Sequence, residues 1–128
     1  IKRLPDDIKS RVHRFGFVKR ERRDQLMNDA TLLVHPSHYE GFGFPVLEAM
    51  SMGTPVVTTT GGALPEIAGE AALNVHPGDV DALADAIIEL LANEELQKKL
   101  SVVGIDRAQM FNWRDTAEGM LDLYTSLL

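Results

Sequence analysis

The chain has 128 residues, 45% of them apolar, and a formal net charge of −6 with no cysteine. This length suits a single domain, the apolar content is enough for a sizeable core, and no run of about 18 apolar residues could span a membrane. With no cysteine and no signal-peptide pattern, a cytoplasmic location is the default expectation.

The charge is unevenly distributed along the chain. Nine of the thirteen basic residues occur up to Arg23, together with only three acidic residues, whereas the rest of the chain holds four basic and sixteen acidic residues. A basic end is typical of contact with nucleic acid or an anionic membrane surface. No aromatic residues are interleaved with Lys19, Arg20, Arg22 and Arg23, so we expect no nucleic acid partner and interpret them as a solvated helix face.

Strands and helices are predicted to alternate. In chain order they are a strand at 12–15, a helix at 20–30, a strand at 31–34, a helix at 45–52, a strand at 55–59, a helical turn at 64–68, a strand at 72–75, and helices at 80–92, 94–110 and 113–127. This alternation predicts an α/β fold with a Rossmann-like parallel sheet and helices on both faces. In the doubly wound order 3-2-1-4-5-6, the strands 12–15 and 31–34 would be third and fourth, so two strands absent from the chain would lie between them.

The segment from His35 to Pro55, HPSHYEGFGFPVLEAMSMGTP, combines a strand end, a glycine-rich loop and a helix start. Open α/β sheets bind ligands at this edge. Gly41 and Gly43 permit positive φ and let backbone N–H groups approach a ligand, and Pro45 suits the first helical turn. The pattern predicts a phosphate and sugar site, and we expect a Cβ at Gly43 to obstruct its amides without unfolding the domain.

Two carboxylates frame this loop. Glu40 precedes the glycines and Glu48 lies in the following helix, so the two should converge from different elements. Carboxylates accept hydrogen bonds from the paired hydroxyls of sugars and riboses, each worth about 1.5–3 kcal/mol. The residues alone also allow a solvated loop position for Glu40 and a carboxylate favoured by the helix dipole for Glu48. A glycoside hydrolase also uses two carboxylates, but a helix beside phosphate-binding amides favours holding a nucleotide.

The stretch PSHYEGFGFPVLEAMSMGTPVV resembles the signature of the retaining GT-B glycosyltransferases, the glycosyl transferases group 1, which include glycogen synthases and sucrose-phosphate synthases. The resemblance extends over nearly the whole chain through VHRFGFV, TLLVHPS, VVTTTGGALPEIAG and NVHPGDVDALADAIIELL. It implies that residues 1–128 form a partial C-terminal nucleotide-sugar-binding domain, without its first strands and without the N-terminal domain of the parent enzyme.

The resemblance also implies roles for individual residues. The residues implied to bind the donor are Glu40, Gly41, Phe42, Gly43, Phe44, Val46, Leu47 and Glu48. Of these, Glu40 would be the catalytic residue at the donor sugar and Glu48 would hold the ribose. Thr59, Gly61 and Gly62 would border the donor pocket, although a simple glycine turn before a short helix is the alternative for them. The family implies no cofactor and no metal, and the grouping of His35, His38 and Glu40 across a strand end and a turn is a poor metal site.

The implied function is nucleotide-sugar donor binding in a retaining glycosyltransferase that transfers a hexose-type sugar. The acceptor would be a glycan, a lipid or a small molecule bound by the missing N-terminal domain, and lipid-linked acceptors would place the enzyme at the membrane periphery. A non-catalytic nucleotide-sugar binding or interaction module is the alternative. Arg14 and Lys19 have the spacing of the family's diphosphate-binding pair but lie too close to Glu40. We therefore expect the fragment alone to be inactive and, with an unpaired strand edge at 31–34, to self-associate.

Overall fold

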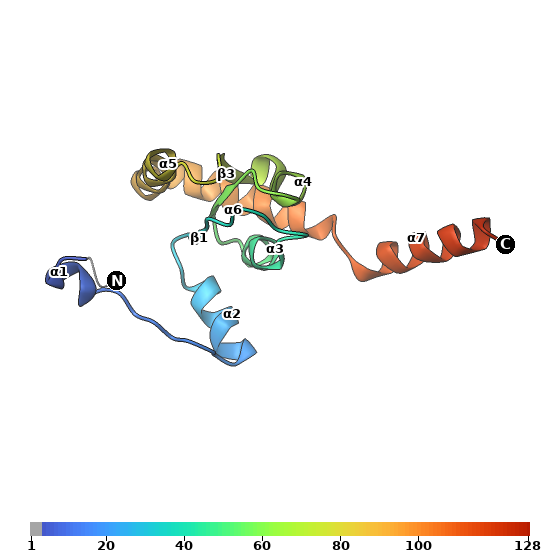
Figure 1. Cartoon of the computed structure of the whole chain (residues 1–128), viewed down its shortest axis with the longest axis horizontal. Helices are drawn as coiled ribbons and strands as arrows, with labels where there is room; N and C mark the ends of the chain where they lie inside the picture. The colour runs from blue at the N-terminus through green and yellow to red at the C-terminus, as the bar shows by residue number, and fades with distance from the viewer. Residues whose placement is uncertain (1–3) are drawn as a thin grey trace.

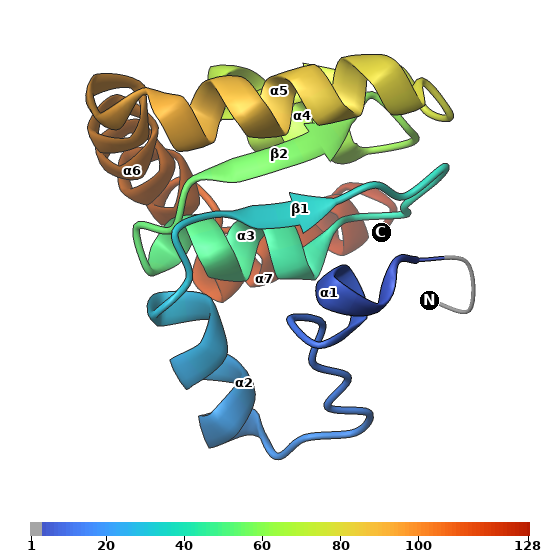
Figure 2. The same ribbon diagram turned by 90° about the vertical axis from the view of Figure 1, so that its left-hand side faces the viewer.

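The structure is a computed structural model that describes residues 4–128. Its centre is a three-stranded parallel sheet in the order β1-β2-β3, formed by Leu33–His35, Val56–Thr59 and Ala72–Val75. Leu33 pairs with Val56 between the first two strands, and Val56 pairs with Ala72 between the second and third. Figure 2 shows β1 and β2 side by side. The three strands occur in the order predicted for the fourth to sixth strands of a doubly wound sheet.

The helical elements are α1 (Asp6–Lys9), α2 (Arg20–Asn28), α3 (Phe44–Ser51), α4 (Leu64–Ala68), η1 (Gly69–Ala71), α5 (Val80–Ala92), α6 (Glu94–Gln109) and α7 (Trp113–Ser126). Helices α5, α6 and α7 are each preceded by an asparagine or aspartate whose side chain accepts a hydrogen bond from a backbone N–H of the first turn. Such caps satisfy an orphan donor and fix where each helix starts. The predicted starts of these helices are confirmed.

Both faces of the sheet are covered, as predicted. Val56 and Val57 are both fully buried and, because neighbouring strand residues point to opposite faces, they belong to different cores. Val56 packs in one cluster with Met50 of α3 and Leu64 of α4, and Val57 packs in the other with Leu90 of α5. All four residues of β2 are buried, as expected of a parallel strand covered on both faces, and the hydroxyls of its two threonines, Thr58 and Thr59, donate to backbone carbonyls of His35 and Ser37.

The strand predicted at 12–15 is wrong. This segment connects α1 to α2 without regular secondary structure and belongs to no sheet, and Val12 and Phe15 are 40% and 51% exposed. Among the residues that the structure describes, β2 is the one strand that pairs with β1, so the outer edge of β1 carries no strand partner there. The predicted open edge at β1 is therefore present, whereas the strand predicted at 12–15 is not formed.

Helix α7 projects away from the rest of the fold, and Figure 1 shows it extending beyond the end of α6. Every residue of α7 is exposed. No helix within residues 4–128 has the length and apolar character needed to cross a membrane. The candidate site lies elsewhere, where β1 and β2 end.

Candidate functional site

Two loops are tied together at the carboxyl ends of β1 and β2. Glu40, in the loop after β1, forms an isolated parallel bridge with Gly62, in the loop after β2. The Ala63 N–H donates to the Glu40 carbonyl at 2.9 Å, and the Thr59 hydroxyl donates to the Ser37 carbonyl. These bonds hold the backbone of Glu40 against the second loop, so the predicted residues of both loops lie together.

Glycine is required where these loops meet. A Cβ at Gly61 would lie 2.3 Å from the carbonyl oxygen of His38, and a Cβ at Gly62 would lie 2.3 Å from that of Glu40. Gly62 also has φ +63°, a backbone conformation that favours glycine. Thr59 is 2% exposed and its hydroxyl is engaged in the bond to the first loop. The second loop therefore sets the position of Glu40.

The carboxylate of Glu40 is oriented by His35 at the end of β1. Glu40 Oε1 lies 3.1 Å from His35 Nε2, and 33% of the Glu40 side chain is exposed. Oε2 makes no hydrogen bond with any residue in the range 4–128. One oxygen is thus anchored by the fold while the other remains free to accept hydrogen bonds.

The N-terminus of α3 presents backbone donors beside this carboxylate. Within the described residues, the N–H groups of Gly41, Phe42 and Gly43 donate no hydrogen bond. They precede the first turn of α3, where the helix dipole is positive and favours an anion. Gly41 is exposed and a Cβ there would meet no atom of the chain within 4 Å. Phe42 is half-buried and Gly43 is buried, so the open approach to these amides is at Gly41, where the backbone can accept an anion such as a phosphate.

Gly43 has a second, structural role that the sequence did not reveal. It has φ +102° and caps α3, and a Cβ on it would lie 2.7 Å from Cδ2 of the fully buried Leu64. The expectation that the domain tolerates a side chain at this position is therefore not supported, because both the backbone and the core oppose it.

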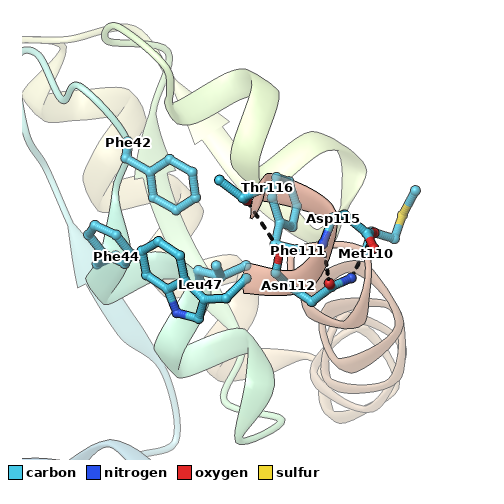
Figure 3. Close-up of a pocket in the computed structure, with 9 residues that line it drawn as sticks. Phe42, Phe44, Leu47, Met110, Phe111, Asn112, Asp115 and Thr116 are labelled. Atoms are coloured by element: carbon cyan, nitrogen blue, oxygen red, sulfur yellow. Dashed lines mark hydrogen bonds between the residues drawn. The ribbon is translucent and has the colours of Figure 1, made fainter. Parts of the chain in front are cut away.

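The apolar residues of the motif point away from the loop backbone. Val46 is fully buried in the core, so its side chain has no route to a ligand. Its backbone N–H already donates to the Gly43 carbonyl at 3.0 Å. Phe42, Phe44 and Leu47 instead line an apolar pocket of about 410 Å³ with Phe111 and Trp113 (Figure 3). The centroid of the Phe42 ring lies 4.6 Å from that of the Phe44 ring. It lies 6.1 Å from that of the Phe111 ring, which it meets edge to face. These contacts anchor the loop.

Glu48 lies on α3 and pairs with Arg23 of α2, a contact that the sequence alone does not predict. Its Oε1 accepts a hydrogen bond from Arg23 Nη2 on α2 at 2.9 Å. Arg23 also donates to Asp24, and this bond is the largest cause of a raised pKa of Arg23, with the charges of Glu48 and Asp24 adding to it. Among the described contacts, Glu48 makes no hydrogen bond to the loop of Glu40.

His35 and Arg23 are the two site residues that sequence reasoning missed. From the sequence alone, His35 is considered only in a poor metal site, and Arg23 only as part of a solvated basic helix face. The signal for Arg23 was weak, since its sequence neighbours identify a helical charge pattern but not a partner 25 residues away.

The chain belongs to the glycosyl transferases group 1 family, whose model matches residues 6–106. It is similar to the O-antigen chain mannosyltransferase B of Escherichia coli, with 36% identity over 91% of this chain and 30% of that protein. It is 37% identical to the MMP alpha-(1->4)-mannosyltransferase of Mycolicibacterium hassiacum, over 88% of this chain and 28% of that protein.

The fold matches a solved structure as well. Sucrose-phosphate synthase from Thermosynechococcus elongatus superposes with a TM-score of 0.83 at 37% identity, over 94% of this chain and 31% of that one. The Rossmann-like α/β class and the GT-B family inferred from the sequence are confirmed. The chain spans about three-tenths of the length of the curated relatives named here.

Proposed function

We propose that the chain binds the nucleotide-sugar donor of a retaining glycosyltransferase that transfers a hexose-type sugar. Family membership and the mannosyltransferase relatives support sugar transfer. The observation that carries the proposal is the run of free N–H groups at Gly41, Phe42 and Gly43, next to a carboxylate whose backbone is fixed by a second loop. A diphosphate and a sugar are the ligand groups that such a pair of features recognises.

In this proposal the donor diphosphate lies against the amides of residues 41–43, which stabilise the charge that develops on phosphate as it departs. Glu40, anchored through Oε1 by His35, accepts hydrogen bonds from the donor sugar through Oε2. Glu48 accepts hydrogen bonds from the ribose hydroxyls. Both glutamates position the donor and neither transfers a proton.

Retention follows if chemistry occurs on one face of the sugar. The bond between the anomeric carbon and the phosphate oxygen breaks, its electron pair passes to phosphate, and the acceptor oxygen bonds to the same face of that carbon. The departing phosphate takes the acceptor proton, so the chain supplies no general base. No cofactor or metal is needed in this scheme.

The acceptor, a glycan, a lipid or a small molecule, would be bound by another part of the parent enzyme, because the chain spans about three-tenths of its relatives. We propose a cytoplasmic location, peripheral at the membrane where the acceptor is lipid-linked. The chain alone would bind donor without transferring sugar.

The test of this function uses two glutamate variants of the intact parent. Glu48→Ala should weaken nucleoside diphosphate binding by about 1.5–3 kcal/mol, the loss of charge-assisted hydrogen bonds, measured by titration calorimetry. Glu40→Ala should lower the transfer rate more than it weakens binding of the bare nucleoside diphosphate, because its partner is the sugar. Glu89→Ala, at an exposed position of α5, is the matched control and should change neither.

The outcomes separate the candidate functions. Binding by both the chain and the parent, with transfer by the parent alone, supports the donor-binding role. Binding without transfer by either would favour a non-catalytic nucleotide-sugar module. Unchanged nucleotide affinity in Glu48→Ala would remove this residue from the site.

A further inference from the structure

A single guanidinium joins α2 to the carboxylate assigned to the ribose. Arg23 Nη2 lies 2.9 Å from Glu48 Oε1 and 3.0 Å from Asp24 Oδ1, and Arg23 Nε lies 3.2 Å from the same Asp24 oxygen. Asp24 therefore orients the guanidinium from its own helix, while Glu48 meets it from α3. A planar guanidinium with fixed donors transmits this orientation to the carboxylate.

The bond leaves most of the accepting capacity of Glu48 unused. A carboxylate offers about four lone-pair sites over its two oxygens, and within residues 4–128 Arg23 takes one site on Oε1 while Oε2 has no hydrogen-bond partner. The Glu48 side chain is 32% exposed, so the free oxygen is within reach of a ligand. Two sites suffice for the two hydroxyls of a ribose.

The pair is better explained by positioning than by stability. The side chains of Arg23 and Glu48 are 38% and 32% exposed, and ion pairs this open to solvent contribute little to folding. The end of α2 is held separately, because the Thr54 hydroxyl donates to the Met27 carbonyl at 2.8 Å. Removing the Arg23 side chain should therefore leave α2 in place.

We propose that Arg23 is a positioning residue that holds Oε1 of Glu48, so that Oε2 faces the ribose diol of the donor. The inference rests on the proposed function, which assigns the ribose to Glu48. An unrestrained glutamate must lose its rotamer freedom when the ligand binds, and Arg23 removes that cost in advance.

The test compares Arg23→Gln with Arg22→Gln in the intact parent enzyme. Arg22 is on the same helix, bonds Gln25 instead of Glu48, and removes the same charge. The probes are UDP and GDP, each with its 2′,3′-dideoxy counterpart, titrated by calorimetry, and thermal melting checks that both variants fold. Arg23→Gln should weaken the better-binding ribonucleotide about 2- to 12-fold, the cost of ordering one side chain. Arg23→Gln should leave the affinity for the dideoxy counterpart unchanged, because that ligand has no ribose diol. Arg22→Gln should change neither affinity.

Each other outcome overturns a specific step. Equal weakening of both ligands would mean that Arg23 acts through overall charge or fold, and tighter ribonucleotide binding would mean that Arg23 competes with the ribose. A large loss in Glu48→Ala with none in Arg23→Gln would reject this inference and keep the proposed function. An unaffected Glu48→Ala would reject the ribose assignment itself, and this inference with it, whereas binding of neither nucleotide would reject the donor-binding role.

Discussion

Gly41 and Gly43 stand two residues apart in the same loop, yet alanine substitution should affect them in opposite ways. Gly43→Ala places a non-glycine residue at φ +102° and a Cβ 2.7 Å from Leu64 Cδ2 in the core. A sparsely populated backbone conformation costs about 1–3 kcal/mol and overpacking a core about 1–3 kcal/mol, so the expected loss of unfolding free energy is about 2–6 kcal/mol. In Gly41→Ala the added Cβ meets no atom of the chain within 4 Å, so the free energy of unfolding should stay within about 0.5 kcal/mol of the wild-type value.

The assay pairs urea denaturation, followed by far-ultraviolet circular dichroism, with calorimetric titration of UDP and GDP. Gly43→Ala should unfold at lower urea with an unchanged denaturant slope. Gly41→Ala should keep the wild-type transition but lose nucleotide affinity, since in the proposed site its Cβ would stand where the phosphate approaches the amides. A wild-type transition for Gly43→Ala would refute the argument from the Leu64 contact, and a destabilised Gly41→Ala would refute the claim that this position is free of structural constraint.

Three further perturbations have defined outcomes. Gly62→Ala should separate the two loops, because its Cβ would lie 2.3 Å from the Glu40 carbonyl oxygen, and should reduce both unfolding free energy and nucleotide affinity; unchanged values in the same two assays would contradict the bridge. Arg107→Met should lower the free energy of unfolding, measured by urea denaturation, by about 1–3 kcal/mol, because the guanidinium donates to two backbone carbonyls of α4. Arg114→Met, at an exposed position, is the control and should leave this free energy unchanged. The 128-residue chain should self-associate through the open edge of β1, and a monomeric mass by light scattering at micromolar concentration would contradict this.

Local signals were sufficient to predict most of the fold from the sequence. The strands β2 and β3 and the helices α5 and α6 lie within a residue of their predicted bounds, because apolar runs and polar caps are encoded by adjacent residues. The segment 12–15 has the same apolar character, but a strand needs a neighbour to complete its backbone hydrogen bonds. The predicted strand order places two strands that are absent from the chain between this segment and β1, and no strand of the described structure pairs with it, so the pattern alone was not enough.

The candidate site was predictable only in part. Glu40, the glycines and the α3 start form one continuous motif, so their proximity follows from chain connectivity. The pairs His35–Glu40 and Arg23–Glu48 depend on how loops and helices pack, and no local pattern encodes either pair. The same limit explains Gly43, whose structural role depends on Leu64 in a later helix.

The alternation of small and aromatic residues in the loop would reconcile two conflicting demands on the proposed phosphate cradle. Free N–H groups require a backbone without neighbouring side chains, whereas tight binding requires a backbone that does not move. Gly41 keeps the approach open, while Phe42 and Phe44 line an apolar pocket together with Phe111 at the junction of α6 and α7 (Figure 3). The aromatic side chains supply the rigidity that the glycines cannot, so the shape of the site depends on a junction more than sixty residues further along the chain.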